Sequence, residues 1–372
     1  MRIALFTEVF PPKIDGITTR LSATLPELVK LEHEVTVFAP ASAGDFPGVD
    51  VVRVPALPFP PYPGLSAALP DPRIVARLAW LRPHVVHAMG PVCLGAWGVL
   101  AARALGLPLV ASFHTDLVRY AAGYRLGFAK SALRRWLAAI HGLAHANLCP
   151  SSATRHELME QGVPRVGIWR GGVDAQRFHP DQRSLAMRAR LSAGRPDLPL
   201  LLYVGRLARE KHIESLAWVM DELSEARLAL IGDGPDRARL ERVFRKLPVH
   251  FAGFLAGDEL AAAFASGDVF VMPSTTETLG FVALEAMASG VPVVAADAGG
   301  LRDVVRHGEN GLLYDPAARK GALAPIQRLL ASRGLRLELA RMGRKTAENA
   351  SWEAETRRLV AAYELAIERA RR

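Results

Sequence analysis

The sequence predicts an α/β protein with two doubly wound parallel sheets, and three observations support this class. The chain has 372 residues, more than one hydrophobic core usually serves, so two domains are expected. Hydrophobic residues make up 50% and charged residues 22%, which is the balance of a globular protein. Short apolar runs alternate with helical patterns through both halves, and this alternation is typical of parallel strands joined by crossover helices.

The expected strands are short apolar runs bounded by turn residues. They span residues 2–7, 34–39, 51–54, 84–88, 109–114 and 147–150 in the first half, and 200–205, 227–232, 250–253, 269–273 and 291–295 in the second. Ligands of open α/β sheets bind beyond the carboxyl ends of the strands. The loops after the first strand of each half, 10–16 and 205–206, carry Gly or Pro and are therefore candidate ligand loops.

The domain boundary is expected within residues 171–199, where glycines and prolines gather. We predict one domain over residues 1–175 and a second over 176–354. The segment Pro55–Pro72 is dense in proline and aromatic residues and is too long for an idle connection, so a functional or mobile loop is predicted. The last predicted helix, 352–370, has a set of apolar residues that indicates docking rather than a free tail. They are Leu359, Ala362, Tyr363 and Ala366.

Composition excludes several classes of protein. Cys93 and Cys149 are the only cysteines, and their apolar surroundings favour a reducing compartment over a disulfide scaffold. The apolar run at the start is too short for a signal peptide. The most apolar stretch, 92–102, is interrupted by glycines and falls well short of the ~20 residues that a bilayer requires. A cytosolic protein is expected.

The net charge is +9 at pH 7 and the isoelectric point is about 9.9. A basic balance suits nucleic acids, anionic membrane surfaces or anionic small ligands. No nucleic-acid-binding motif accompanies the charge, so nucleic acid is not an expected partner. Part of the excess is simply an arginine-rich composition.

The stretch Glu277–Glu285 places two carboxylates eight positions apart. Residues 280–289 are predicted to form a helix that a following glycine and proline end. Glu277 precedes the unpaired N–H groups of the helix start, which attract phosphate, and Glu285 lies a little over two turns further along. This suits a nucleotide sugar, whose diphosphate has hydroxyls on both sides. An ordinary helix with an acidic residue at its start is the alternative.

Two positive side chains follow the first strand of the second half. Arg206 and Lys211 would stand at its carboxyl end, where an arginine fork and a lysine point charge can hold phosphate. A solvated charge cluster with Glu210 is the alternative. Gly232 and Gly234 form a tight turn after the next strand, and glycines there allow a flat base to approach, although such turns also occur without a ligand.

The order and spacing of these motifs resemble glycosyltransferase family 4, whose GT-B fold has two Rossmann-like domains facing across a cleft. In the second half the matching residues are Gly205-Arg-Leu, Glu210-Lys211, Gly232-Asp-Gly-Pro235, Glu277 with Gly280-Phe, Glu285-Ala-Met-Ala-Ser-Gly290-Val-Pro-Val-Val and Gly311. In the first half they are Phe10-Pro-Pro, Asp15-Gly16-Ile, Ser112-Phe-His114-Thr-Asp116 and Gly171-Gly-Val-Asp174 with Phe178-His-Pro180. The first half departs at Asp15, where the family usually has Gly, and at Glu32, where Gly is common. The resemblance covers nearly the entire chain.

The resemblance implies four residues that act at the reacting centre. Arg206 and Lys211 would bind the donor diphosphate and offset the charge that grows on the leaving group. Glu277 would bind hydroxyls of the transferred sugar. His114 would touch the sugar near its reacting face.

The resemblance also implies a set of donor-binding residues. Glu285 would bind the ribose hydroxyls, and Gly16 would let the backbone approach the diphosphate from the opposite domain. The other members would present backbone groups or leave room for the nucleotide, and they are Gly205, Gly232, Gly234, Leu279, Gly280 and Phe281. The last helix, 355–372, would cross back onto the first domain.

A retaining transfer without a metal is implied as well. Fixed cations and N–H dipoles would stabilise the departing phosphate, and we assign no protein nucleophile. No two aspartates are separated by one residue, so a metal-holding Asp-x-Asp is absent. His141 and His145 have helical spacing but lie outside any His-Glu-x-x-His pattern, so histidines of a helix face or a core are predicted rather than a zinc site.

The segments 113–120 and 169–174 resemble the lipid-glycosylating branch of the family, which includes sulfoquinovosyl-, mannosyl- and glucuronosyl-diacylglycerol synthases. A diacylglycerol-type lipid is therefore the expected acceptor and a UDP- or GDP-hexose the expected donor. The protein would then work in the cytoplasm at the inner face of the membrane.

The candidate acceptor and membrane residues combine basic and aromatic side chains at near-helical spacing. They are Asp116, Arg119, Tyr120, Tyr124, Arg125, Arg134, Arg135 and Trp136. This surface would lie on anionic lipid, and Phe59, Tyr62 and Leu65 could add an apolar lip. The alternative is a helix with an apolar buried face and a basic solvated one.

Other functions remain open at this point. The same transfer could use a soluble or polysaccharide acceptor. A nucleotide-sugar epimerase of GT-B fold would call for an acid/base set that the sequence does not offer. A catalytically silent binding protein is disfavoured because Arg206, Lys211, Glu277 and Glu285 are all intact.

Overall fold

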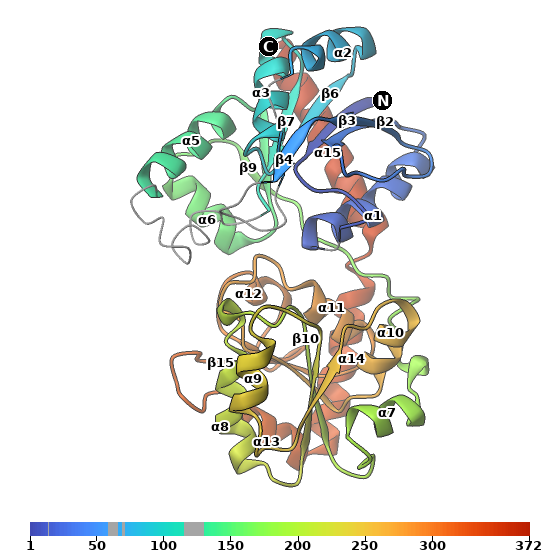
Figure 1. The fold of residues 1–372 in the computed structure, drawn as a ribbon, viewed down its shortest axis with the longest axis vertical. Coiled ribbons are helices and arrows are strands. Elements are labelled where there is room, and N and C mark those ends of the chain that lie inside the picture. The colour runs from blue at the N-terminus through green and yellow to red at the C-terminus, as the bar shows by residue number, and fades with distance from the viewer. Residues whose placement is uncertain (14, 59–65, 69–70, 115–129) are drawn as a thin grey trace. The chain divides into compact units, whose positions relative to one another are not determined.

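The computed structural model describes residues 1–13, 15–58, 66–68, 71–114 and 130–372. That part of the chain divides into two compact units, Met1–Arg170 with Trp352–Arg372, and Gly171–Ser351 (Figure 1). The division falls a few residues before the predicted boundary. Val173 forms a β-bridge with Ser351, and its side chain is buried in the core of the second unit. Residues 171–175 therefore belong to the second unit.

The first unit is built around a seven-stranded parallel sheet in the order β3-β2-β1-β6-β7-β8-β9. Its strands are β1 (Arg2–Thr7), β2 (Glu34–Pro40), β3 (Asp50–Val54), β6 (Val85–Met89), β7 (Leu109–Ser112), β8 (Ala146–Cys149) and β9 (Val166–Ile168). The chain first builds outward from β1 through β2 to β3 and then returns to place β6 on the other side of β1. The strand order therefore reverses between β1 and β6.

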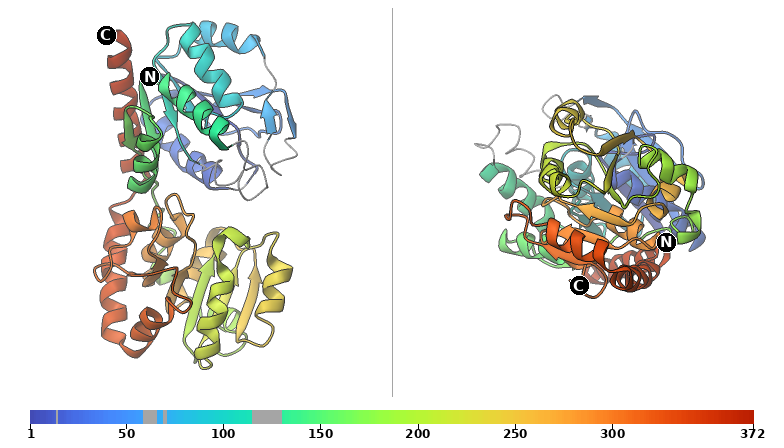
Figure 2. Two further views of the ribbon diagram at one scale, coloured as in Figure 1. Left: turned by 90° about the vertical axis from the view of Figure 1, so that its left-hand side faces the viewer. Right: turned by 90° about the horizontal axis from the view of Figure 1, so that it is seen from below.

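Helices cover both faces of this sheet (Figures 1 and 2). They are α1 (Gly16–Lys30), α2 (Arg73–Leu81), α3 (Leu94–Ala104), α5 (Lys130–Gly142), α6 (Ser152–Glu160) and α15 (Trp352–Arg371). Successive residues of a strand point to opposite faces. In β1, Ile3 and Leu5 accordingly pack into the cluster that holds α1 and α15, whereas Phe6 packs into the cluster that holds α2 and α3.

The second unit has a six-stranded parallel sheet in the order β12-β11-β10-β13-β14-β15. Its strands are β10 (Leu200–Val204), β11 (Arg227–Ile231), β12 (Val249–Gly253), β13 (Val269–Met272), β14 (Val293–Ala296) and β15 (Leu312–Tyr314). Its α-helices are α7 (Leu185–Leu191), α8 (Leu216–Glu222), α9 (Arg237–Val243), α10 (Gly257–Ala265), α11 (Phe281–Ala288), α12 (Leu301–Val304), α13 (Leu323–Ala331) and α14 (Arg333–Glu348), and its 3-10 helices are η2 (Pro180–Gln182), η3 (Arg209–Lys211) and η4 (Ile213–Ser215). Here the strand order reverses between β10 and β13.

The predicted α/β class with two parallel sheets is confirmed, and the ends of the predicted strands differ by at most two residues. The edge strands β9 and β15 were not predicted, because three residues are too few to carry a visible pattern. The segment Pro55–Pro72 is more than a loop, since β4 (Ala56–Pro58) and β5 (Ser66–Ala68) pair antiparallel within it. Phe59, Tyr62 and Leu65 lie outside the described residues.

The last helix, α15, runs along the first unit (Figures 1 and 2). Leu359, Tyr363 and Ala366 recur along one side of this helix and are fully buried in the core between the sheet and α1. Within the described part of the chain, every helix is too short or too polar to span a bilayer.

Candidate active site

The reversal of strand order in the second unit brings two loops together. One follows β10 and contains Arg206 and Lys211, and the other follows β13 and contains Glu277. A crevice beyond the carboxyl ends of the strands at such a reversal is the usual ligand site of an open α/β sheet. The strand order thus indicates the same two loops as the sequence motifs did.

Lys211 and Glu277 form an ion pair, with 2.5 Å between Nζ and Oε1. Their side chains are mostly buried, with exposed fractions of 20% and 15%. Lys211 ends the short helix η3, and the hydroxyl of Thr276 donates to the carbonyl of Glu210 at 3.2 Å. These contacts hold the cation and the carboxylate at one end of the sheet.

Arg206 stands apart from this pair. Its side chain is exposed, while its carbonyl accepts a hydrogen bond from the buried Tyr203 hydroxyl at 3.1 Å. Among the described residues its guanidinium has no ion-pair partner. The structure therefore leaves this second cation of the motif available to a ligand.

The helix α11 begins at Phe281, one residue after the predicted start, and Gly280 is its N-cap with φ of 86°. This left-handed conformation favours glycine. A glycine offers no capping side chain, and the N–H of Ala283 donates to the carbonyl of Gly280 at 3.0 Å. A β-carbon at Gly280 would also lie 2.7 Å from the side chain of Leu301. Anion binding at this helix start stays a prediction.

The side chains of Leu279 and Phe281, which were predicted as backbone donors, also contribute to packing. A β-carbon added at Gly171 would lie 2.0 Å from the ring of Phe281 and 2.7 Å from the side chain of Leu279. These side chains therefore pack directly on the backbone of Gly171 and anchor the start of α11.

The sequence analysis missed Gly299 and Gly300, which lie between β14 and α12. The N–H of Gly300 donates to the carbonyl of Glu277 at 2.8 Å. A β-carbon would lie 2.6 Å from that carbonyl oxygen at Gly299 and 2.1 Å from the carbonyl oxygen of Thr278 at Gly300. Only glycines allow this approach, so the pair holds the Glu277 loop in place. A Gly-Gly pair directly after a strand was the available signal.

Packing of the backbone requires glycine at Gly232 and Gly234, whether or not a base approaches them. A β-carbon at Gly232 would lie 2.1 Å from the carbonyl oxygen of Gly205, and one at Gly234 would lie 2.3 Å from that of Leu207. The N–H of Leu207 donates to the carbonyl of Asp233 at 3.0 Å. The loops after β10 and β11 thus pack backbone against backbone, which accounts for these glycines without a ligand.

Glu285 lies on α11, one turn beyond Phe281, and its side chain is half-buried. Within the described residues its carboxyl group has no hydrogen-bond or ion-pair partner. Burial raises the pKa of this carboxyl to about 7. A half-buried carboxyl without a protein partner beside a helix start is a fitting hydroxyl ligand.

We expect Glu285→Gln to change how stability depends on pH. The folded pKa lies above the unfolded value near 4.5, so the stabilising effect of the bound proton is full below the unfolded pKa and is lost as pH rises through about 7. Between about pH 5 and pH 8 the melting temperature of the wild type should fall relative to that of Glu285→Gln. The exposed Glu338→Gln is the matched control. A difference that stays constant across this range would contradict the assignment.

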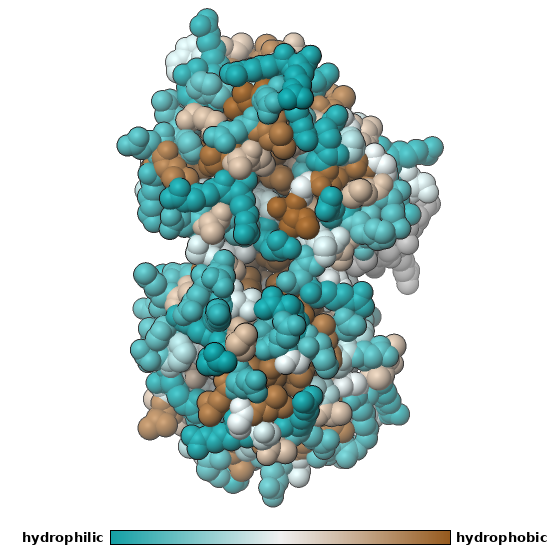
Figure 3. Space-filling model, turned by 180° about the vertical axis from the view of Figure 1, so that it is seen from behind, coloured by the Kyte–Doolittle hydropathy of each residue, from teal (hydrophilic) through white to brown (hydrophobic). Residues whose placement is uncertain are grey.

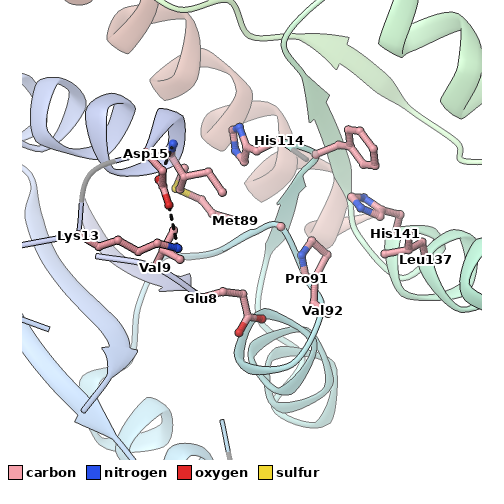
Figure 4. Close-up of a pocket in the computed structure, with 13 residues that line it drawn as sticks. Glu8, Val9, Lys13, Asp15, Met89, Pro91, Val92, His114, Leu137 and His141 are labelled. Carbon is pink, nitrogen blue, oxygen red and sulfur yellow. Dashed lines mark hydrogen bonds and ion pairs between the residues drawn. The ribbon is translucent and has the colours of Figure 1, made fainter. Parts of the chain in front are cut away.

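The first unit has a cavity of its own at the reversal between β1 and β6 (Figure 4). Its volume is about 60 Å³, enough for a small polar group or about two waters. The lining residues end β6, follow β1, β6 or β7, or lie on α1 or α5. They are Glu8, Val9, Lys13, Asp15, Ile17, Met89, Gly90, Pro91, Val92, Phe113, His114, Leu137 and His141. His114 is the one residue of this lining that was predicted to act in catalysis.

Glu8 was missed by the sequence analysis. Its Oε1 accepts hydrogen bonds from the N–H groups of Cys93 at 2.7 Å and Gly95 at 3.0 Å, at the start of α3. Its Oε2 is buried and has no partner among the described residues. Burial raises the pKa of this carboxyl. A single glutamate after a strand forms no recognisable sequence pattern. The partners of Glu8 lie at the start of α3, far along the chain, so the sequence does not reveal its role.

Gly16 is the first residue of α1, directly after the N-cap Asp15. The Asp15 carboxylate accepts from the N–H groups of Ile17 and Thr18 and pairs with Lys13 at 3.1 Å (Figure 4). A β-carbon at Gly16 would meet nothing within 4 Å. The fold therefore gives no steric reason for glycine here, unlike at Gly232 and Gly234.

The predicted acceptor residues are divided by the limits of the described chain. Asp116, Arg119, Tyr120, Tyr124 and Arg125 lie outside the described residues. Arg134, Arg135 and Trp136 lie on α5, where all three are exposed.

The opposite side of α5 is buried through Leu137, Ile140 and His141. The helix thus has the buried apolar face of the alternative prediction and a basic, partly aromatic outer face. The predicted lipid-binding surface and the alternative of a basic solvated face both agree with this arrangement.

His141 and His145 each bind a separate protein group. Nδ1 of His141 lies 2.8 Å from Oδ1 of Asn147, and Nδ1 of His145 accepts from the N–H of Leu109 at 3.0 Å. The His141 imidazole is thus a core contact, and that of His145, which lies outside α5, is a turn contact.

Comparison with known proteins identifies the family to which this fold belongs. The family profile described as Glycosyltransferase Family 4 matches residues 14–177, and the one described as Glycosyl transferases group 1 matches residues 190–346. Sucrose-phosphate synthase from Thermosynechococcus elongatus superimposes with a TM-score of 0.81 at 23% identity, over 98% of each chain.

Curated relatives extend along most of the chain. Sulfoquinovosyl transferase SQD2 of Arabidopsis thaliana is 38% identical over 96% of this chain and 72% of its own. A GDP-mannose-dependent alpha-mannosyltransferase of Mycolicibacterium smegmatis is 41% identical over 90% of both. Alpha-monoglucosyldiacylglycerol synthase of Streptococcus pneumoniae is 28% identical over 84% of this chain and 75% of its own. With the two parallel sheets and the site at the β10–β13 reversal, these matches show that the chain is a glycosyltransferase of family 4 with the GT-B fold.

Proposed function

We propose that this glycosyltransferase moves a hexosyl group from a UDP- or GDP-hexose to a hydroxyl of a diacylglycerol-type lipid, with retention of configuration and without a bound metal. The observation that carries the proposal is the cluster at the β10–β13 reversal. It joins the Lys211–Glu277 pair, the exposed Arg206, the uncapped start of α11 and the unpartnered Glu285.

Each part of this cluster suits one part of a nucleoside diphosphate sugar. Lys211 and Arg206 would neutralise the diphosphate, whose charge grows as the bond to the sugar breaks. Glu277 would accept from hydroxyls of the hexose, and Glu285 from those of the ribose. Because two side-chain cations and helix N–H groups supply the positive charge, a metal would not be required.

The lipid acceptor is supported by relatives and by one surface. The relative from Streptococcus pneumoniae is by name a diacylglycerol glycosyltransferase. On α5, Arg134, Arg135 and the 44% exposed Trp136 present two cations and an indole, a combination that suits an anionic lipid surface. On the face of each unit seen in Figure 3, hydrophobic residues surface only in separate small areas. The two arginines on α5 would supply electrostatic attraction to such a surface.

The test combines donor, acceptor and product. The protein is incubated with UDP- or GDP-hexoses and with vesicles that contain diacylglycerol, and the lipid product is identified by mass spectrometry and its anomeric configuration by NMR. An α-linked glycolipid formed from an α-linked donor, with the rate unchanged by EDTA, is expected. Transfer only to a soluble sugar, inversion, epimerisation of the donor, or loss of the rate with EDTA would each overturn the corresponding part of the proposal.

Membrane association has its own measurement. Co-sedimentation with vesicles of anionic lipid should exceed that with neutral vesicles, and an Arg134→Glu, Arg135→Glu double variant should remove the difference. Equal sedimentation with both lipids would sink the membrane part of the proposal and leave the transfer untouched.

We expect Gly16→Ala to separate function from folding. Alanine in the first turn of a helix should stabilise the fold by about 0.5 kcal/mol, because its β-carbon meets no neighbour. It should nevertheless lower kcat/KM for the donor if that open space receives a ligand. Gly334→Ala is the matched control, since it also lies in the first turn of a helix with nothing within 4 Å of a β-carbon. Full activity in Gly16→Ala would remove Gly16 from the site.

A further inference from the structure

Three buried side chains of the first unit and the partly buried His114 form one hydrogen-bonded chain. Nε2 of His114 lies 2.7 Å from Oγ of Ser112, and the same Oγ lies 2.8 Å from Nε2 of His87. Nδ1 of His87 lies 2.8 Å from the hydroxyl of Tyr363. The first of these residues lines the cavity and the last lies on α15. The chain thus connects the cavity to a helix that follows it by more than two hundred residues in sequence.

We propose that Ser112, His87 and Tyr363 are positioning residues that fix which nitrogen of His114 carries its proton. The catalytic use of this device rests on the proposed function, whereas the placement of the proton does not.

Counting hydrogens gives two orders for the chain. In one order, the Tyr363 hydroxyl donates to His87, Nε2–H of His87 donates to Ser112, and the Ser112 hydroxyl donates to Nε2 of His114. In the other, every donor and acceptor is exchanged. A serine hydroxyl has one hydrogen and two lone pairs. If both imidazoles accepted from Ser112, one of them would be left without a donor, and if both donated to it, the hydrogen of Ser112 would have no acceptor among the described residues. The proton positions on both imidazoles are therefore coupled.

Tyr363 decides between the two orders. Its side chain is fully buried, and His87 provides its hydroxyl with its single hydrogen-bond partner among the described residues. If the hydroxyl only accepted, its own hydrogen would be left without an acceptor, at a cost of about 1–3 kcal/mol. The order in which Tyr363 donates is therefore favoured. In that order Nε2 of His114 is an acceptor, and Nδ1 carries the proton.

The surroundings keep both imidazoles neutral, so that each carries a single ring proton. Burial and, to a smaller extent, the Arg20 guanidinium lower the pKa of His87 to about 3. Burial likewise holds the pKa of His114 well below its usual range, with smaller effects of Arg20, His87 and His141. The indole of Trp169 lies between these groups, with ring centroids 5.7 Å from both His87 and His114.

The consequence is a defined chemical role for His114. With Nε2 bound to Ser112, the nitrogen that remains for a ligand is Nδ1–H, a hydrogen-bond donor. Such a group can hold a hydroxyl or phosphate oxygen but cannot take a proton from it. His114 would therefore orient a ligand in the cavity beside Glu8, whose free Oε2 is the complementary acceptor.

The test reads the tautomer of His114 in the unliganded protein. In ¹⁵N spectra of histidine-labelled protein, a protonated ring nitrogen is well separated from an unprotonated one. The wild type should show Nδ1–H at His114, and Tyr363→Phe, which removes only the hydroxyl, should give a mixture of tautomers. Ser112→Ala breaks the chain next to His114 and serves as the second variant, and Tyr314→Phe in β15 is the control for loss of a tyrosine hydroxyl.

Kinetics then tests the positioning role. Tyr363→Phe should lower kcat about tenfold, the equivalent of one hydrogen bond, with little change in KM for the donor. An Nε2–H tautomer in the wild type, an unchanged tautomer in both variants, or an unchanged kcat in both would overturn the proposal. The spectra are recorded without substrate. If no glycosyl transfer is found, the proposed function is refuted, and the spectra still test the proton position on His114 independently.

Discussion

Lys211→Ala should lower kcat for glycosyl transfer about 100- to 1,000-fold, the usual effect of removing one preorganised group that stabilises transition-state charge. The ammonium group lies at the carboxyl end of β10, paired with Glu277 and mostly buried. A charge in that setting acts on the departing diphosphate more strongly than an exposed one would. KM for the donor should change less than kcat, because the charge on the leaving group grows in the transition state.

A second role of Lys211 can be separated from this one. If the lysine only holds Glu277 in place, Glu277→Gln should show the same loss as Lys211→Ala, and the double variant should be no worse than either. If both groups contact the donor, the double variant should be more impaired than each single variant. The matched control is Lys320→Ala, which breaks an exposed ion pair with Glu222 in the same unit. A Lys211→Ala enzyme within threefold of the wild type at saturating donor would contradict the assignment, on the scale of about 0.7 kcal/mol.

The sheets and the helix of the proposed donor site were predictable because their signals are local. The alternation of apolar runs and helices predicted both sheets, and residues 280–289 were predicted as a helix, which the structure places at Phe281–Ala288. Both patterns are fixed within a few residues of the chain by strand and helix geometry. The role of this helix start in binding an anion stays a prediction.

The polar contacts of Glu8, His87 and Tyr363 in the first unit were not predictable, because each of these residues is defined by a distant partner. His87 and Tyr363 are 276 residues apart and meet only when α15 packs on the sheet. Glu8 matters because α3 begins beside it. For Gly232 and Gly234 the sequence left both the approach of a base and a turn without a ligand open, and the structure shows a backbone contact between neighbouring loops that demands glycine in either case.

Arg20→Met should destabilise the first unit by about 2–5 kcal/mol, because it removes the charged donor of two carbonyl groups and the cation stacked on Trp169. Arg20 lies on α1 and is only 2% exposed. Its Nη1 donates to the carbonyls of Trp169 and Arg170 at 3.1 Å each, and its guanidinium lies 4.3 Å from the centre of the Trp169 ring. Burial lowers its pKa to about 10, so the group remains a cation at neutral pH.

The destabilisation should be confined to one unit, which gives the measurement its control. Hydrogen exchange followed by mass spectrometry should show faster exchange in peptides from β1 and β6 and unchanged exchange in peptides from β10. Arg73→Met removes an exposed arginine paired with Asp71 and should leave both units unchanged.

Arg20→Lys should fall between Arg20→Met and the wild type, because lysine keeps the charge but loses the planar fork and the stacking on the indole. If Arg20→Met and the wild type exchange alike, the buried cation does not hold α1 to the end of β9. Its effect on the two imidazoles would then have to be tested alone. In that case the pKa of His87 should rise in the variant, because the guanidinium lowers it in the wild type. An unchanged His87 pKa would show that burial alone keeps this imidazole neutral.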